Sequence, residues 1–273
     1  MLRMESATGW WLITHPDHAR LAGAFATAWG NAEFRKPEPR ARVLKGIACH
    51  DDGWAARDAH PSITRQGKPS AFSTELVGKY SAFEEIDLAE YLAVRERAVR
   101  IIAEDDAYAG LLISMHTYNL LTAHADRSTI AAEGLRLLDE FLEKQRGYQS
   151  ELKAAIAEDG SLKSEEKAEQ TILEHFRLLQ ACDNLSLLTC VAFDAPADLL
   201  HPLALNGGRT ADVKVEALGP RHFRLTPWPF EERELTFQFP ARHVEGKTFG
   251  SSQELEEAFT KASVETVAVR LSQ

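Results

Sequence analysis

The chain opens with an apolar stretch that gives way to a helical pattern. Residues 9–14 are short, apolar and partly β-branched, which predicts a strand. Apolar residues then recur at helical spacing as far as Gly30, namely at Leu21, Ala22, Phe25, Ala26 and Trp29. Thr14 is the expected N-cap, with Pro16 and Asp17 in the first turn, where proline is tolerated and a carboxylate suits the helix dipole.

Helical patterns cover most of the chain up to about residue 194. They predict helices at about residues 40–53, 83–103, 107–124 and 130–156, and one more from residue 164 onward. The helix at 40–53 has an inner stripe of Val43, Leu44, Ile47 and Ala48, and Gly53 is expected to end it. Residues 55–72 are irregular and follow this helix directly. A long loop in this place is expected to form one wall of a site.

Beyond about residue 194 the pattern changes from helical to alternating. Alternation at residues 213–215, 222–225, 235–239 and 264–271 predicts antiparallel strands, with one short helix at about 252–262. The predicted fold class is therefore mainly α: a helical bundle with a small C-terminal α+β appendage. The predicted domains are a helical one at 1–200 and a small β-rich part at 201–273 that packs on it.

Composition and charge restrict the function. The 273 residues are 44% hydrophobic and 26% charged, as in an ordinary globular protein. No apolar run is long enough to span a bilayer and the start has no signal-peptide core, so we expect no membrane association and a cytoplasmic location. The three cysteines show no CxxC spacing and fit a reduced compartment. A net charge of −10 argues against nucleic-acid binding and means that an anionic substrate would need local cations.

Five polar residues fall on the inward faces of the predicted helices: His18, His50, Asp51, His116 and Asp183. Asp183, for example, interrupts the apolar row Ile172, Phe176, Leu179 and Leu187. A single inward histidine is more often a satisfied core residue than a ligand. Five such groups on four helices favour a metal site, because buried carboxylates are normally paired or bound to metal. A mixed imidazole and carboxylate set suits Mn, Fe, Co, Ni or Zn.

The order of these residues resembles the HD-domain superfamily. The resemblance lies in His18, then His50-Asp51 closing an apolar helix and followed by Gly53, then Asp183 in the stretch Leu-Gln-Ala-Cys-Asp-Asn-Leu. It covers about residues 10–195. It implies an all-α fold and metal-dependent phosphohydrolase activity, with His18, His50, Asp51 and Asp183 as the four metal ligands. The amino-acid sequence of residues 13–19 and 50–54 also resembles that of a bacterial family of unknown function.

The resemblance has departures that bear on the number of metal ions. His116 is similar in position to the additional histidine of two-metal members. No His-His pair follows near it, however, and His124 points roughly 80° away on the same helix. Asp52 stands where an apolar residue is common. One divalent transition metal is therefore expected rather than two.

The predicted function is a phosphomonoesterase or phosphodiesterase that acts on a small phosphate ester or nucleotide through a metal-activated water. Asp51 and Asp52 are the candidate catalytic residues. The candidate substrate-binding residues are Lys45, Trp54, Lys68 and Arg177, and Lys79 is a weaker candidate. Solvated surface charges and a core tryptophan are the alternative interpretations of these side chains.

Two alternatives to hydrolysis stay open. An HD-type iron oxygenase would need about six protein ligands, and the sequence offers five. A catalytically silent metal- or ligand-binding module would use the C-terminal strands as its partner surface. The sequence leaves the substrate and any homo-oligomer undetermined.

Overall fold

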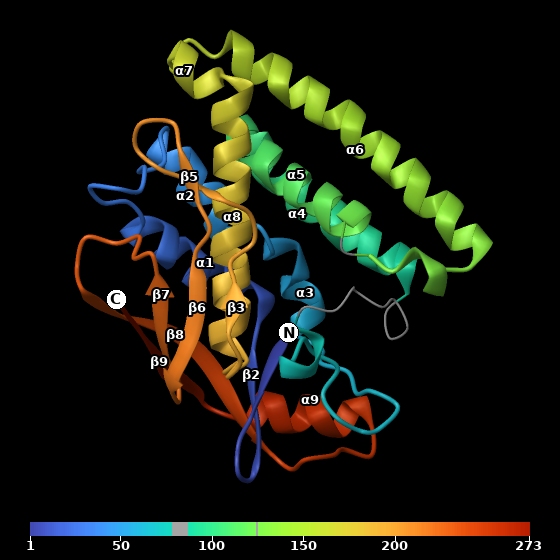
Figure 1. Cartoon of the computed structure of the whole chain (residues 1–273). Coiled ribbons are helices and arrows are strands. Elements are labelled where there is room, and N and C mark those ends of the chain that lie inside the picture. The colour runs from blue at the N-terminus through green and yellow to red at the C-terminus, as the bar shows by residue number, and fades with distance from the viewer. Residues whose placement is uncertain (78–86, 124) are drawn as a thin grey trace.

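The computed structural model describes residues 1–77, 87–123 and 125–273. A long helix, α8 (Glu169–Cys190), runs through the middle of the molecule, with a sheet on one side and helices α4 (Leu88–Asp105), α5 (Ala107–Ala123) and α6 (Ala132–Glu158) on the other (Figure 1). Between the sheet and α8 lies α1 (His15–Ala28), which contacts both. The short α2 (Arg40–Ala48) packs against α1, α5 and α8.

The sheet has seven strands and curves into a half-barrel. Its strand order is β1 (Leu2–Glu5), β2 (Gly9–Ile13), β8 (Glu234–Glu245), β9 (Val264–Ser272), β7 (His222–Thr226), β6 (Lys214–Gly219) and β3 (Ala197–Asp198). All neighbours are antiparallel except β7 and β9, which are parallel. A separate two-stranded ribbon joins β4 (Leu203–Ala204) to β5 (Thr210–Ala211), and α9 (Ser252–Lys261) connects β8 to β9. The remaining elements are short: η1 (Asp52–Trp54), α3 (Ala55–Asp58), η2 (Thr74–Leu76), η3 (Arg127–Thr129) and α7 (Ser164–Lys167).

The predictions of an all-α protein and of a mainly α bundle with a small appendage are both wrong. About 51% of the residues are helical and about 21% lie in strands, and the sheet is a principal layer of the molecule. The reason is long-range pairing: β2 pairs with β8, with Trp10 opposite Val244, so the N-terminal hairpin completes a sheet built mostly from residues beyond 197. The division into domains at 1–200 and 201–273 stays a prediction.

The helices and the sheet share one hydrophobic core. Phe25 of α1 packs edge-on against Phe237 of β8, with ring centroids 4.8 Å apart. Buried residues of β1, α1, α8 and the central strands all belong to the same contact cluster. The position of α1 is therefore set by the sheet as well as by α8.

Most helix predictions agree with the structure to within a few residues over the described ranges, but α2 ends at Ala48, five residues before the predicted end at Gly53. Thr14 caps α1 as expected, since its side chain accepts a hydrogen bond from the backbone of Asp17. The helix expected from Ser164 is divided at Ala168 into α7 and α8. The predicted start of the helix at 83–103, together with Lys79 and His124, lies outside the described residues.

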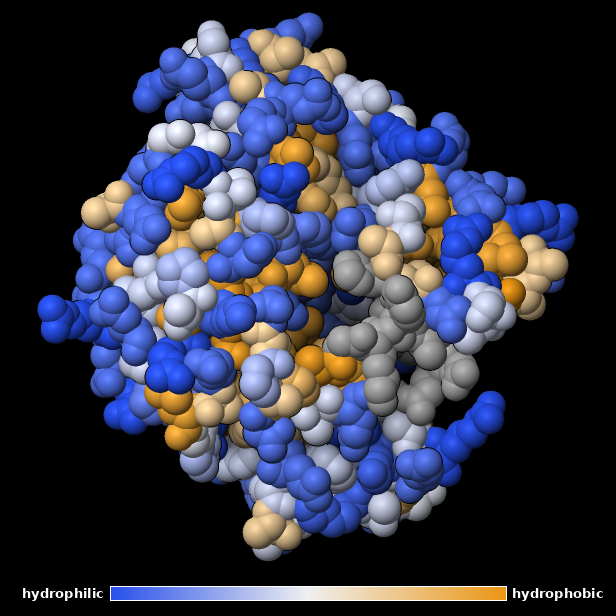
Figure 2. Space-filling model, viewed as in Figure 1, coloured by the Kyte–Doolittle hydropathy of each residue, from blue (hydrophilic) through white to orange (hydrophobic). Residues whose placement is uncertain are grey.

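The surface seen in Figure 2 is largely hydrophilic, with apolar side chains gathered toward its centre. The large apolar residues that are most exposed come from five different elements: Leu76, Ile101, Leu137, Leu218 and Val264. Within the three described ranges, no helix combines the length and apolar content needed to cross a membrane.

The pairing of β2 with β8 can be tested at Gly9. A Cβ on Gly9 would lie 2.0 Å from the carbonyl oxygen of Val244. We expect Gly9→Ala to lower the free energy of unfolding by about 1–3 kcal/mol, the usual cost of overpacking. Urea denaturation measures this. Gly147→Ala, at a position in α6 where an added Cβ meets nothing within 4 Å, is the control and should be stabilising by about 0.5–1 kcal/mol. Equal effects of the two substitutions would contradict the close packing of β2 on β8.

Candidate metal centre

Five buried side chains converge between α1, α5, α8 and the turn that follows α2. His18 lies on α1, His50 and Asp51 in the turn, His116 on α5 and Asp183 on α8. Their exposed fractions are 0%, 0%, 4%, 1% and 6% in this order. Two carboxylates are thus removed from water, which is costly unless cations accompany them. We call these five residues the His/Asp cluster.

The distances within the His/Asp cluster are those of ligands around a metal ion. His18 Nε2 lies 3.0 Å from Asp51 Oδ2, and His50 Nε2 lies 3.2 Å from Asp183 Oδ1. His116 Nε2 is 3.9 Å from Asp183 Oδ2. The ligand atoms form two overlapping groups, His18/His50/Asp51 and His50/His116/Asp183, each within 4.8 Å. Ligand bonds of about 2.0–2.2 Å place the donors of one ion about 3–4.4 Å apart. The cluster can therefore hold a metal ion.

Hydrogen bonds on the far side of two rings fix which nitrogen faces the cluster. The hydroxyl of Ser186 donates to the carbonyl of Asp183 at 2.8 Å, so its oxygen accepts from Nδ1–H of His18, also at 2.8 Å. Nδ1–H of His50 donates to the carbonyl of Ile47 at 2.7 Å. Both rings therefore carry a proton on Nδ1, so in its neutral form each ring has its lone pair on Nε2, as metal-binding histidines require.

Each of these lone pairs is directed at a carboxylate oxygen. Two acceptors about 3 Å apart repel each other unless a cation lies between them. The Nε2 atom of His50 is buried and has no hydrogen-bond partner among the described residues. Asp183 Oδ1 lies 3.2 Å from it, but this contact does not count as a hydrogen bond. The residues therefore fit a metal ion: two nitrogen lone pairs and two carboxylates need a shared positive charge.

A buried arginine balances part of this negative charge. Arg95 of α4 is 7% exposed, and its guanidinium donates to Asp51 Oδ1. Its Nε donates to the hydroxyl of Tyr91 at 3.2 Å, and its Cζ lies 5.3 Å from the ring centroid of Trp54. Because Arg95 holds Oδ1 of Asp51, the other oxygen, Oδ2, is presented to His18. Arg95 is not among the site residues predicted from the sequence.

The pKa values follow from this arrangement. Burial disfavours the charged form of both carboxyls, but Arg95 and His50 hold the pKa of Asp51 well below its usual range. His50 lowers the pKa of Asp183 to about 2 in the same way. Burial opposes a charged imidazole at His50, but Asp51 and Asp183 outweigh it and raise its pKa to about 9. Burial lowers the pKa of His116 to about 3. The cluster thus favours an additional positive charge, which a proton on His50 supplies when no metal ion is bound.

The turn that carries His50 and Asp51 differs from the prediction. The helix was expected to run to Gly53, but α2 ends at Ala48 and η1 begins at Asp52. Gly53 instead permits a close approach to α4, since a Cβ there would lie 2.4 Å from the carbonyl oxygen of Val94. This contact holds the turn against the helix that provides Arg95.

The structure leaves several predicted site residues outside the His/Asp cluster. The predicted catalytic Asp52 pairs with Arg20 at 2.9 Å on the surface, because η1 turns its side chain away from Asp51. Lys45 pairs with Asp105, and the Lys68 ammonium lies 6.0 Å from the ring of Trp10. These three do not contact the cluster.

The other two predicted substrate-binding residues lie differently. Trp54 borders the cluster, since its buried ring contacts Arg95 and stacks on His15 with ring centroids 4.5 Å apart. Arg177 is half-buried on α8, six residues before Asp183.

A second histidine–carboxylate pair adjoins the His/Asp cluster. Nδ1 of His15 lies 3.0 Å from Asp58 Oδ2, and the His15 ring is 6.0 Å from the ring of His18. Burial lowers the pKa of His15 to about 4, so its ring is neutral at pH 7. Asp58 is 4% exposed and accepts from the backbone N–H of His15 and from the N-terminal ammonium of Met1, which also lies 2.7 Å from Nδ1 of His15. The pair places a neutral imidazole beside the cluster.

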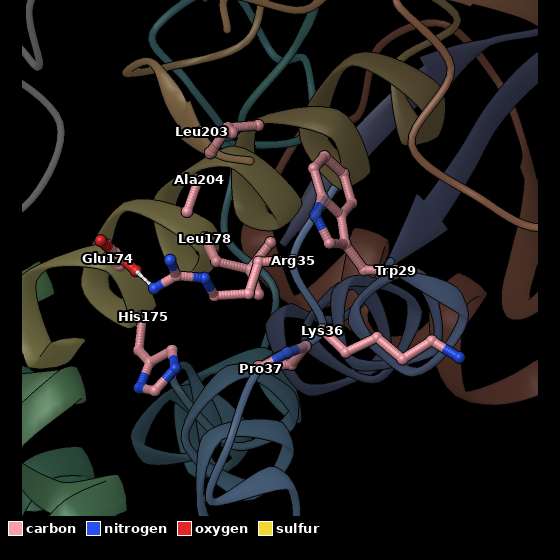
Figure 3. Close-up of a pocket in the computed structure, with 9 residues that line it drawn as sticks. All are labelled: Trp29, Arg35, Lys36, Pro37, Glu174, His175, Leu178, Leu203 and Ala204. Atoms are coloured by element: carbon pink, nitrogen blue, oxygen red, sulfur yellow. Dashed lines mark hydrogen bonds and ion pairs between the residues drawn. The ribbon is translucent and has the colours of Figure 1, made fainter. Parts of the chain in front are cut away.

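A shallow pocket at the other end of α8 is separate from the cluster (Figure 3). Arg35 reaches across it to Glu174 at 2.7 Å, and His175 contacts the hydroxyl of Tyr108 at 2.8 Å on its far side. Glu174 precedes Asp183 by nine residues, about 13 Å along a helix. The pocket therefore contributes nothing to the metal centre.

The fold and the site together define an α+β protein with a buried His/Asp cluster able to hold a metal ion. A family model described as "Protein of unknown function (DUF3891)" matches residues 1–246, and the chain belongs to this family. The match includes all five cluster residues and names no activity. No curated protein and no solved structure gives a significant match.

Removing the cation that pairs with Asp51 should be strongly destabilising. We expect Arg95→Met to lower the free energy of unfolding by about 3–5 kcal/mol, because it leaves a buried carboxylate without its partner. Urea denaturation in the presence of a chelator gives the value. Arg100→Met on the same helix is the control, since Arg100 pairs with Glu96 and its side chain is 48% exposed. It should cost at most about 1 kcal/mol. A loss at Arg95 as small as at Arg100 would show that the Asp51 pair is not buried.

Buried His175 should make stability fall in mild acid. Its folded pKa is lowered to about 4 by burial, below the ordinary value of 6.5. Between these two pH values the unfolded chain takes up a proton that the folded chain does not, so the free energy of unfolding decreases by about 3 kcal/mol as pH falls. His175→Asn lacks this contribution. Denaturation at pH 7.5 and pH 4.5 should therefore show a smaller loss in the variant, and identical losses would refute the assignment.

Proposed function

We propose that the protein is a metal-dependent phosphohydrolase that acts on a small phosphate ester or nucleotide. The observation that supports it is the pair of tautomer-fixed imidazoles, His18 and His50, whose Nε2 lone pairs face the carboxylates of Asp51 and Asp183. The ordered resemblance of these four residues to the HD-domain superfamily gives the proposal its reaction class.

The local charge also favours an anionic substrate. The carboxylates of Asp51 and Asp183 carry two negative charges, and Arg95 carries one positive charge beside them. With a divalent cation the group has one net positive charge, in a protein whose overall charge is −10. A local positive potential in a dry site attracts phosphate much more strongly than the same charge in water.

The donor set suits one transition metal ion. Imidazole nitrogens and carboxylate oxygens bind Mn, Fe, Co, Ni or Zn in preference to Ca. The two groups of ligand atoms share His50, which argues for one ion between them rather than two. Such an ion polarises a phosphoryl oxygen and makes water more acidic.

The residues of the chain would orient and neutralise the reacting groups. Arg95 fixes Asp51, so that its free oxygen has one orientation. The ring of His15, held beside Asp58, stays neutral next to the cluster and adds no charge of its own to it. Trp54 packs over both Arg95 and His15 and keeps water away from them.

The test compares metal content and hydrolysis in matched variants. The wild-type protein should bind about one equivalent of Mn, Fe, Co, Ni or Zn in elemental analysis after dialysis, and hydrolyse at least one compound of a phosphate-ester and nucleotide panel. The Asp183→Asn variant should lose both properties, because the substitution removes the carboxylate that faces both His50 and His116. Asp52→Asn, next to a ligand but directed at Arg20, should keep both.

Several outcomes would contradict the proposal or the arrangement of residues on which it rests. Metal binding that survives Asp183→Asn would exclude the cluster as the metal centre. Bound metal without turnover of any phosphate ester would remove the hydrolase assignment, and oxygen consumption by iron-loaded protein would favour an oxygenase. Equal losses in Asp52→Asn would show that the turn after α2 is organised differently.

A further inference from the structure

A chain of hydrogen bonds leads from the His/Asp cluster to the segment that precedes β4. Nε2 of Gln180, on α8, lies 3.3 Å from Nδ1 of His116. Oε1 of the same amide lies 2.6 Å from Nε2 of His201. Gln180 is fully buried and His201 is half-buried in the segment that leads into β4. A single amide therefore joins the two imidazoles.

The orientation of this amide determines the tautomer of His116. The amide nitrogen has only hydrogens to offer, so Nδ1 of His116 must be the acceptor. The proton of the neutral ring is then on Nε2, the atom that faces Asp183. In this arrangement His116 cannot bind a metal through Nε2. His116 thus differs from His18 and His50, whose tautomers leave Nε2 free.

A 180° rotation of the Gln180 amide would exchange its oxygen and nitrogen and so reverse the tautomer of His116. Oε1 would then accept from Nδ1–H of His116, and Nε2 of His116 would present a lone pair to Asp183. On the other side, the amide nitrogen would donate to His201, whose Nε2 must then act as acceptor. In the orientation present in the structure, His201 Nε2–H donates to Oε1 and holds the amide in place. The two rings thus change their roles together.

We propose that Gln180, held by His201, decides whether His116 can join the metal ligands. The inference rests on the metal site of the proposed function and adds a positioning residue to it. His18, His50 and Asp51 form one ligand group without His116, whereas the second group requires it. Reversal of the amide therefore adds a fourth or fifth ligand, and the segment before β4 controls it through His201.

The backbone of His201 supports a specific role for this ring. Its φ of 65° lies in the left-handed region, which is uncommon for residues other than glycine. Its ring also packs near Phe176 of α8, with centroids 5.7 Å apart. The contacts with Phe176 and Gln180 together hold the imidazole of His201 against α8.

The tautomer can be measured directly, without metal. Long-range ¹H–¹⁵N correlation spectra of histidine-labelled protein distinguish Nε2–H from Nδ1–H rings. With chelator present, His116 should be the Nε2–H tautomer in the wild-type protein. Gln180→Glu, which offers only acceptors to both rings, should convert it to Nδ1–H. In His201→Asn the asparagine tolerates the left-handed backbone but is too short to reach the amide. This variant should therefore shift His116 toward the Nδ1–H tautomer.

Metal titration provides the second readout. With Mn or Zn, Gln180→Leu should weaken binding by about 10–100-fold, the usual effect of losing a partner behind a ligand. Gln180→Glu should bind at least as tightly as wild type. Gln145→Leu is the control, because Gln145 is another buried glutamine but bonds Ser114 and no cluster residue. It should leave the affinity unchanged even if it lowers stability.

The outcomes separate this inference from the proposed function. An Nδ1–H tautomer of His116 in the metal-free wild type, or no change in Gln180→Glu, would overturn the role of Gln180 whatever the protein catalyses. An unchanged tautomer in His201→Asn would overturn the role of His201. Absence of hydrolysis with the expected tautomers and affinities would refute the phosphohydrolase and leave the positioning role supported.

Discussion

The contact on which the rest of the site depends is an imidazole lone pair facing a carboxylate in a dry interior. It occurs twice, at His18 with Asp51 and at His50 with Asp183. Neither pair is stable as two opposed acceptors, so each needs a proton or a metal ion between its two atoms, and Arg95 alone cannot serve both pairs. The raised pKa of His50 shows the same requirement, since a proton can meet it when no metal does. The site is therefore selective for positive charge before any substrate is considered.

The helices and the sheet contribute differently to this contact. Every cluster residue comes from a helix or from the turn after α2, so the chemistry belongs to the helical layer. The sheet fixes where α1 lies, because Phe25 packs on β8 and β2 leads directly into the N-cap of α1. His18 thus owes its position to strands more than two hundred residues away in the chain. A helical bundle with a detachable appendage would leave α1 without the packing surface that β8 provides.

The sequence predicts the cluster better than it predicts the fold, and the reason is physical. A polar residue on an apolar helical face is visible at short range, and this is how Asp183 and His116 were found. By the same criterion Arg95 could have been found, because it stands three residues after Leu92 and four before Val99 on the inner face of α4. The pairing of β2 with β8 leaves no such local sign: alternation predicts a strand but not its partner. The hydrogen bonds of Ser186 and Gln180 depend on side-chain contacts between elements, which spacing alone does not give.

The sheet also bears on what the resemblance to the HD-domain superfamily can mean. That resemblance implies an all-α fold, whereas this chain has a seven-stranded half-barrel beside the helices that carry His18, His116 and Asp183. Function belongs to sites rather than to folds, so the difference in scaffold does not by itself decide the activity. This scaffold also connects the candidate metal centre to the segment before β4, because Gln180 contacts both His201 and His116. His201 stands two residues before β4, so this segment contacts the His/Asp cluster through the buried amide of Gln180, and any influence by this route must pass through that amide.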